Sequence, residues 1–236
     1  MFTHYYTEGV ILARRPMRDA DEVFTFFTKD FGKIEVTGRS IRKNNSKLRM
    51  NTDTFSHVEI GFIQGKSYNT LTDATCLSSF KDAKKSLGKT SLFYRISELV
   101  LALVYGQEKD ERVYFFLLNS FQKVDKETFS KNSLRLFYCF FSLNLLYFLG
   151  HRMYIEKCVF CGKPIKKECY FDPKEGGVTC KDCFSESRFG VYLESVDVLR
   201  CFFRPDLKKI LQQDPKVCMN ILESYLSFVP ELQKKN

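Results

Sequence analysis

The sequence has no stretch that we expect to act as a secretory signal or to span a membrane. Its first residues have no basic n-region and no long apolar stretch, so they do not form a secretory signal. The most apolar stretch, from Leu134 to Leu149, is interrupted by Arg135, Ser142 and Asn144 and is shorter than the roughly 20 residues that cross a bilayer. These absences predict a soluble, cytoplasmic protein with no membrane partner, in which this stretch forms a buried helix.

Enzyme signatures are also missing. The sequence has no G-x-S-x-G nucleophile elbow, no phosphate-binding loop of the form G-x-x-x-x-G-K-[ST] and no glycine-rich dinucleotide fingerprint. The neighbouring carboxylates Asp19, Asp21 and Glu22 fit a polar turn before a strand better than an acid–base pair. Because no motif marks a catalytic centre, we expect a binding protein and no enzyme.

Tryptophan is absent, yet the chain is well supplied with core-forming residues. Hydrophobic residues make up 44% of the sequence and aromatic residues 15%, with 24 phenylalanines. This composition excludes global disorder and allows a sizeable core. A length of 236 residues suits one large domain or two to three small ones.

Disulfide bonds are not expected, although the chain has nine cysteines, because a protein without a secretory signal stays in a reducing compartment. Four of them form two close pairs with the spacing C-x2-C-x18-C-x2-C: Cys158, Cys161, Cys180 and Cys183. Two such pairs can converge on one tetrahedral Zn2+ ion. Four thiolates fill its coordination sphere, so we expect one structural zinc ion. Cys169, inside the loop, has no paired cysteine and is only a possible substitute ligand.

A zinc-dependent nucleic-acid-modifying enzyme is the alternative interpretation of these cysteines. Nucleobase deaminases combine a P-C-x-x-C pair with an H-x-E element. Neither cysteine pair follows a proline here, and a formal H-x-E match, His57-Val58-Glu59, falls in a predicted strand far from the cysteines. Strand packing explains this match better than catalysis.

Positive charge is concentrated in one segment. The formal net charge is +9, but the first eighty residues carry 11 basic and 9 acidic residues. Between Val36 and Thr52 there are five basic residues and no acidic one: Arg39, Arg42, Lys43, Lys47 and Arg49. Interspersed Gly, Ser and Asn predict a flexible loop that phosphates can approach, which suits sequence-independent binding of a nucleic-acid backbone. Arg14, Arg15 and Lys33 could extend this surface, whereas the bland alternative is a solvated loop.

The pattern before residue 80 predicts a small β-barrel. Runs near residues 9–13, 22–28, 33–37, 54–62 and 68–75 have the alternation or the β-branched and aromatic content of strands. Five strands in this length suit an OB fold, which often presents a nucleic-acid-binding face, although an SH3-like barrel has a similar pattern.

After residue 80 the period becomes helical. Segments 91–106, 110–124, 133–149, 195–203, 205–213 and 215–229 are predicted helices, with Gly150 as a C-terminal cap. The sequence thus predicts an α+β protein with an N-terminal OB-fold β-barrel (1–80) and an α-helical domain (81–236). A zinc-binding segment (151–190) is embedded in the helical domain.

These parts occur in a specific order along the chain. The N-terminal part has Gly9-Val-Ile-Leu12, Arg14-Arg15, Phe31-Gly32-Lys33 and Gly38-Arg-Ser-Ile-Arg-Lys43; the C-terminal part has Leu145-Leu146, Leu149-Gly150, Cys158-Val-Phe-Cys-Gly162 and Gly176-Gly-Val-Thr-Cys180 with Cys183. In this combination the chain resembles the RecO family of bacterial DNA-repair and recombination-mediator proteins.

The resemblance implies an OB fold, a helical domain and an embedded zinc site. It also implies binding to single- and double-stranded DNA, annealing of complementary strands and partnership with RecR. Members help to load RecA onto DNA coated with single-stranded-DNA-binding protein (SSB), and we expect contact with the acidic, apolar C-terminal tail of SSB. A nucleoid-associated location in the cytoplasm follows from these roles.

Overall fold

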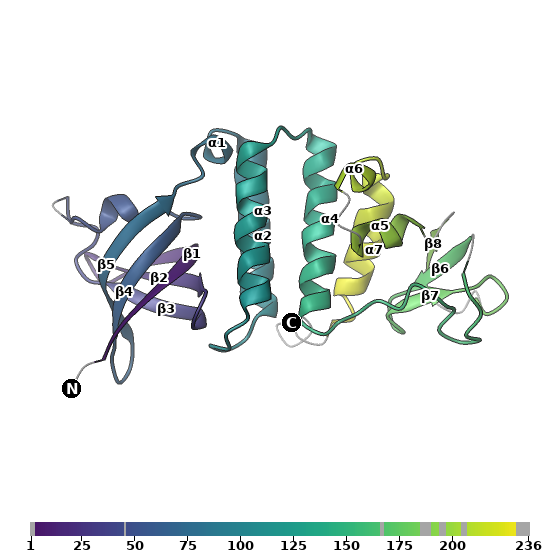
Figure 1. Ribbon diagram of the computed structural model, residues 1–236, viewed down its shortest axis with the longest axis horizontal. Coiled ribbons are helices and arrows are strands. Elements are labelled where there is room, and N and C mark those ends of the chain that lie inside the picture. The colour runs from purple at the N-terminus through teal and green to yellow at the C-terminus, as the bar shows by residue number, and fades with distance from the viewer. Residues whose placement is uncertain are drawn as a thin grey trace. The chain divides into compact units, whose positions relative to one another are not determined.

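The computed structural model describes residues 3–44, 46–165, 168–184, 190–193, 197–203 and 207–229 (Figure 1). Contacts divide the chain into two compact units, Met1–Thr128 and Phe129–Asn236, and each is described by itself. The predicted domain limits, 1–80 and 81–236, follow the sequence pattern and stay a prediction.

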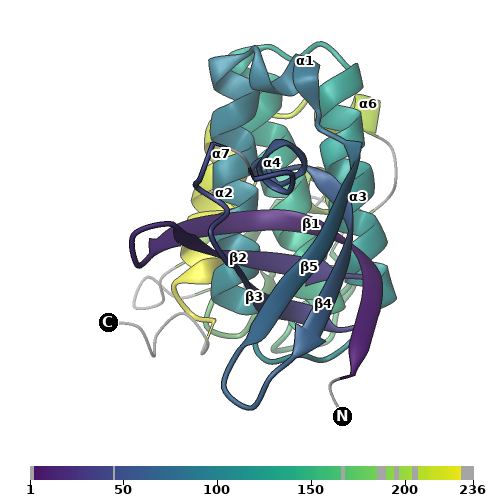
Figure 2. The ribbon, with the colours of Figure 1, turned by 90° about the vertical axis from the view of Figure 1, so that its left-hand side faces the viewer.

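The first unit is built on a closed five-stranded barrel. Its strands are β1 (His4–Met17), β2 (Asp21–Thr28), β3 (Gly32–Gly38), β4 (His57–Gln64) and β5 (Asn69–Ser78). They follow one another around the barrel in the order β1-β2-β3-β5-β4, and β4 pairs with β1 to close it (Figure 2). Only the β3–β5 pair is parallel. This arrangement is the OB fold and confirms that prediction over the SH3-like barrel.

Alternation along the strands fills the barrel. Phe24 and Phe26 of β2, Ile34 and Val36 of β3 and Val58 of β4 all lie in one buried cluster. The register of β1 shifts between Ile11 and Ala13, a β-bulge that bends this long strand around the barrel. The strand extends several residues beyond the apolar run that predicted it, because its polar ends still pair with β2 and β4.

Three helices complete the first unit: α1 (Lys81–Lys84), α2 (Leu87–Leu103) and α3 (Glu111–Lys126). Phe93 of α2 stacks on Phe121 of α3 with 4.1 Å between the ring centroids. Phe55, which precedes β4, packs edge-on against both rings. Asp110 caps α3 by accepting hydrogen bonds from the backbone N–H groups of Arg112 and Val113. These aromatic contacts attach the helices to the barrel.

The second unit combines helices with a small sheet. The helices are α4 (Lys131–Phe148), α5 (Asp197–Phe203), α6 (Leu207–Ile210) and α7 (Pro215–Leu226). Gly150, with φ +93°, follows the end of α4, and Asp214 caps α7. Strands β6 (Cys169–Asp172), β7 (Gly177–Thr179) and β8 (Val191–Leu193) pair in the order β7-β6-β8. Among the described helices, none has both the length and the apolar composition needed to cross a bilayer.

Candidate nucleic-acid interface and metal centre

The basic segment connects β3 to β4 and is anchored in the barrel core. Ile41 is 1% exposed and belongs to the core cluster, and Leu48 packs against that cluster. The short 3-10 helix η1 (Arg49–Asn51) and the buried Thr52 then return the chain to the barrel. We call residues 39–52 the basic loop. Ile41 and Leu48 point inward, whereas the charged side chains of the loop are exposed.

Hydrogen bonds attach the same loop to the turn between β1 and β2. The backbone N–H of Ser40 donates to the Asp21 carboxylate over 2.7 Å, and the N–H of Arg42 donates to the carbonyl of Ala20 over 3.0 Å. Ser40 takes a left-handed conformation with φ 51° to make this connection. The sequence predicted a flexible loop from its small polar residues. The described part of it is instead held by turns and by contacts with its neighbours.

All five cations of the basic loop are exposed: Arg39, Arg42, Lys43, Lys47 and Arg49. None forms an ion pair with a carboxylate of a residue that the structure describes. Arg39 donates to the Tyr68 hydroxyl over 2.8 Å, with its guanidinium 5.7 Å from the centre of that ring. Arg49 donates to the side-chain oxygen of Asn44 over 3.2 Å. Unneutralised cations on an ordered loop form a surface suited to phosphates.

The other predicted DNA contacts have different surroundings. Arg14 and Arg15 are exposed near the end of β1, where Arg15 forms an exposed ion pair with Glu35 over 3.2 Å. The Lys33 ammonium donates to the carbonyls of Leu101 and Val104 at the C-terminal end of α2. Because helix C-termini attract cations, this geometry favours a structural role for Lys33. Direct DNA contact by any of the eight basic residues stays a prediction.

His57 occupies a polar contact between the barrel and α3. Its Nε2 lies 3.1 Å from a carboxylate oxygen of Glu8 and 3.1 Å from the hydroxyl of Tyr114. Burial lowers the pKa of His57 although Glu8 opposes the shift, and burial raises the pKa of Tyr114 far above its ordinary value. Glu59 is exposed on the outside of the barrel. The contacts with Glu8 and Tyr114 therefore explain why a histidine occupies this position.

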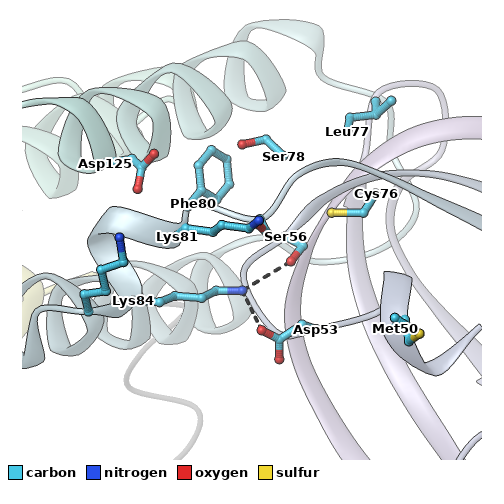
Figure 3. Close-up of a pocket in the computed structure, with 12 residues that line it drawn as sticks. Met50, Asp53, Ser56, Cys76, Leu77, Ser78, Phe80, Lys81, Lys84 and Asp125 are labelled. Atoms are coloured by element: carbon cyan, nitrogen blue, oxygen red, sulfur yellow. Dashed lines mark hydrogen bonds and ion pairs between the residues drawn. The ribbon is translucent and has the colours of Figure 1, made fainter.

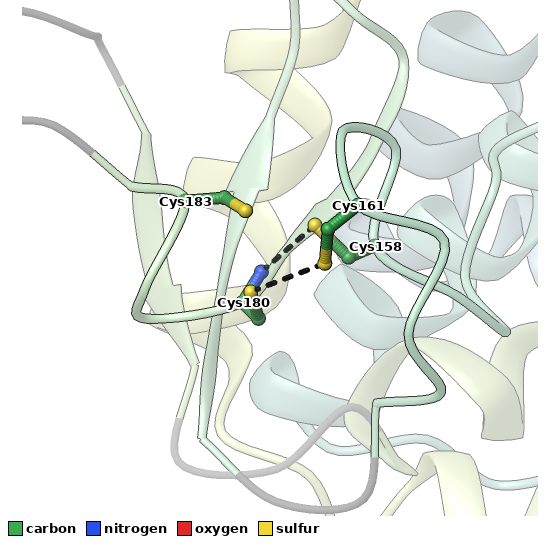
Figure 4. Close-up of side chains that lie close together, drawn as sticks. All are labelled: Cys158, Cys161, Cys180 and Cys183. Atoms are coloured by element: carbon green, nitrogen blue, oxygen red, sulfur yellow. Dashed lines mark hydrogen bonds between the residues drawn. The ribbon is translucent and has the colours of Figure 1, made fainter.

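The four predicted zinc ligands lie together in the second unit. The Sγ atoms of Cys158, Cys161, Cys180 and Cys183 are all within 4.8 Å of one another, and Figure 4 shows their side chains converging. The Cys161 and Cys180 sulfurs are 3.7 Å apart, well beyond the roughly 2.05 Å of a disulfide bond. A Zn–S bond of about 2.3 Å places the sulfurs of a tetrahedral site about 3.8 Å apart. The donor set and its spacing fit zinc.

Two turns bring the cysteine pairs into position. The N–H of Gly162 donates to the Cys158 carbonyl over 2.9 Å, with Gly162 at φ +70°, and the N–H of Cys183 donates to the Cys180 carbonyl over 3.1 Å. The N–H of Cys180 donates to the Cys158 sulfur over 3.4 Å and so joins the two turns. Such N–H···S bonds stabilise thiolate and orient it as a ligand.

The thiols of the cluster differ in pKa. Burial favours the neutral Cys158 thiol, but the backbone N–H groups of Cys161, Cys180 and Phe160 outweigh burial and lower its pKa to about 6. Hydrogen bonds with the thiols of Cys180 and Cys161 raise the pKa of Cys183 to about 12. The protein alone thus favours charge on one sulfur, and a divalent cation would stabilise negative charge on the others.

Cys169 belongs to the support of the site. It is fully buried in β6, pairs with Leu193 of β8 and lies outside the four-cysteine cluster. The sequence did not predict the sheet of β6–β8. The adjacent aromatic residues Tyr170 and Phe171 of β6 were the available signal. Two lysines between the cysteine pairs, Lys166 and Lys167, lie outside the described residues.

An OB barrel with an exposed basic loop, followed by helices and a four-cysteine cluster that could hold a metal ion, is an arrangement typical of nucleic-acid-binding proteins. The family model "Recombination protein O N terminal" matches residues 1–80, and "Recombination protein O C terminal" matches residues 85–236. The chain belongs to the RecO family, which assigns it a role in DNA repair and recombination.

Several similar proteins carry the name DNA repair protein RecO. The Symbiobacterium thermophilum protein is 30% identical over 77% of this chain and 72% of its own length. The Dehalococcoides mccartyi protein is 24% identical over 87% of this chain and 81% of its own, and that of a Thermoanaerobacter species 25% over 98% and 91%. The family that the sequence motifs indicated is confirmed.

Proposed function

We propose that this protein is a non-enzymatic recombination mediator that binds single- and double-stranded DNA and anneals complementary strands. The observation that carries the proposal is the basic loop, with five exposed cations on an OB barrel and no carboxylate paired with them among the described residues. Phosphate contacts of this kind are independent of sequence, as a mediator of recombination requires.

The proposed mechanism is physical. Two complementary strands repel each other because every nucleotide carries a negative charge. Cations on an ordered loop neutralise part of that charge on both strands, so complementary bases can pair. Each contact is weak, so the duplex can then dissociate from the protein. Zn2+, held by the four cysteines, would close the knuckle and stabilise the second unit without taking part in chemistry.

Partners follow from family membership. We infer that RecR binds this protein and that the pair helps to load RecA onto SSB-coated single-stranded DNA. An acidic, apolar SSB tail requires an apolar groove with a nearby cation. A groove of about 890 Å3 in the second unit, lined among others by Tyr147, Phe203 and Arg152, supports this assignment.

Strand annealing on SSB-coated DNA tests the proposal. Wild-type protein should accelerate annealing of complementary oligonucleotides, RecR should promote transfer to RecA, and a variant with Arg39, Arg42 and Lys43 changed to alanine should anneal more slowly. An unchanged rate for a folded variant would refute the role of the basic loop.

The alternative is a zinc-dependent nucleic-acid-modifying enzyme. Its support is the cysteine cluster together with His57 and Glu59. Product analysis after incubation of zinc-loaded protein with labelled DNA or RNA separates the two. Cleavage or deamination that is lost in the Glu59→Gln variant would favour the enzyme hypothesis over the mediator hypothesis.

A further inference from the structure

A groove opens in the first unit where the basic loop ends. It has a volume of about 900 Å3 and lies between η1, the end of β5 and α1. Figure 3 shows Lys81 and Lys84 of α1 extending in the same direction, towards Ser56, with Met50 of η1 on the opposite side. We call this space the α1 groove.

The lysines at the α1 groove are paired with carboxylates, except for Lys81. Lys84 donates to Asp53 over 2.7 Å and to Ser56 over 3.2 Å. Lys85 pairs with Asp82 over 2.8 Å. The exposed Lys81 has no ion pair or side-chain hydrogen bond with any residue that the structure describes. The groove therefore offers one unneutralised ammonium group to a ligand.

Apolar side chains lie at the same groove. Met50 is 88% exposed and Leu77 is 48% exposed, both large fractions for apolar residues. Met50 directly follows Arg49, the last cation of the basic loop. A polarisable thioether makes favourable contacts with aromatic rings and adapts to ligands of different shape. The groove thus presents one cation that can bind a phosphate and an apolar surface suited to bases. It follows directly after the basic loop and its five cations.

We propose that the α1 groove binds single-stranded nucleic acid as a continuation of the basic loop. Lys81 contacts one phosphate, and Met50 and Leu77 contact unstacked bases. This inference rests on the proposed function, because the strand must first lie on the basic loop. We assign the groove to a nucleic acid and not to an acidic peptide because it directly follows the five exposed cations of the basic loop, which would already hold a strand; the carboxylates Asp53 and Asp125 at the groove repel both kinds of anion.

Two substitutions separate the two kinds of contact. Lys81→Ala removes one phosphate contact, so the loss of single-strand affinity between about 50 and 200 mM salt should be about 2.6-fold smaller than in the wild type, from a slope of about 0.7 per contact. Met50→Ser removes apolar contact with bases. It should lower affinity for single strands, leave the salt slope unchanged and leave duplex binding unchanged, because duplex bases are stacked inside. Both side chains are exposed, so both variants should fold.

Oligonucleotides of increasing length locate the contact. Short ones that occupy only the basic loop should bind both variants like the wild type, and the difference should emerge as length increases. Lys216→Glu, on the exposed start of α7, is the control for overall charge when compared with Lys81→Glu. Benzoylphenylalanine in place of Leu77 should crosslink to long single strands.

The outcomes distinguish this inference from the proposed function. If the alanine variant of Arg39, Arg42 and Lys43 binds normally, the proposed DNA-binding loop fails. If that variant is weakened while Lys81→Ala and Met50→Ser match the wild type at every length, only the α1 groove fails. Lys81-dependent binding of an acidic apolar peptide without any effect on oligonucleotides would assign the groove to a protein partner.

Discussion

Salt dependence gives a quantitative test of the basic loop. Each phosphate contact to single-stranded DNA contributes about 0.7 to the slope of log affinity against log salt. If all five cations of the loop contact phosphates, the loop contributes about −3.5 to the wild-type slope, and this contribution alone lowers affinity about 130-fold between about 50 and 200 mM salt. Changing Arg39, Arg42 and Lys43 to alanine leaves two loop contacts, which contribute about −1.4 to the slope and lower affinity about 7-fold.

Fluorescence anisotropy with a labelled oligonucleotide at several salt concentrations measures both slopes. The substituted side chains are exposed and their removal leaves the anchor Ile41 in place, so the free energy of unfolding should change by less than about 0.5 kcal/mol per site. A matched control changes three exposed lysines of the zinc-binding segment to alanine: Lys163, Lys174 and Lys181. Equal losses in the two variants would attribute binding to net charge. An unchanged slope in the loop variant would refute the reasoning.

Three further predictions concern the support of these surfaces. Metal analysis should find about one zinc ion per chain. Chelation of the metal or Cys161→Ser should lower the melting temperature. A metal-free protein with reduced thiols and an unchanged melting temperature would contradict the structural role. Because burial lowers the pKa of His57 below its ordinary 6.5, the unfolded chain binds the proton first as the pH falls. The free energy of unfolding should therefore decrease below about that pH, and urea titrations of His57→Gln should show a weaker dependence. Lys33→Met should destabilise the first unit by about 1–2 kcal/mol through lost bonds to the α2 carbonyls, whereas an unchanged stability with a smaller salt slope would make Lys33 a DNA contact.

The barrel was predictable because its strands obey a simple rule. Each of the five has an apolar or alternating run that one buried face requires, as in Lys33-Ile-Glu-Val-Thr37. The helices were predictable for the same reason, with caps such as Gly150 and Asp214 near their expected ends. The strand order was not, because pairing between β1 and β4 joins residues about fifty positions apart, and no local pattern reports it.

Short elements and paired charges escaped prediction. Strands β6–β8 have three or four residues each, too few for a period to be visible. The metal ligands were found because their identity and spacing carry the signal by themselves. Lys33 and Lys81 show the opposite case, since a single lysine carries no such signal in the sequence. Only the fold shows that one of them is bonded to helix carbonyls and the other has no such partner in the described structure.

Because the backbone of the basic loop is held in place, its cations would bind DNA at a lower entropic cost than those of a flexible segment. A flexible cationic segment would lose backbone conformational entropy on binding a strand, at a cost of about 1–2 kcal/mol for each residue that becomes fixed. Ile41, Leu48 and the bond from Ser40 to Asp21 hold the backbone before DNA arrives, so this part of the cost is already met in folding. The Lys and Arg side chains themselves stay exposed and keep their rotamer freedom. A loop with a fixed backbone and free side chains can position two strands and still release the duplex, because each contact remains weak and exchangeable with salt. Annealing requires this combination, which neither a disordered tail nor a rigid, deeply paired site would provide.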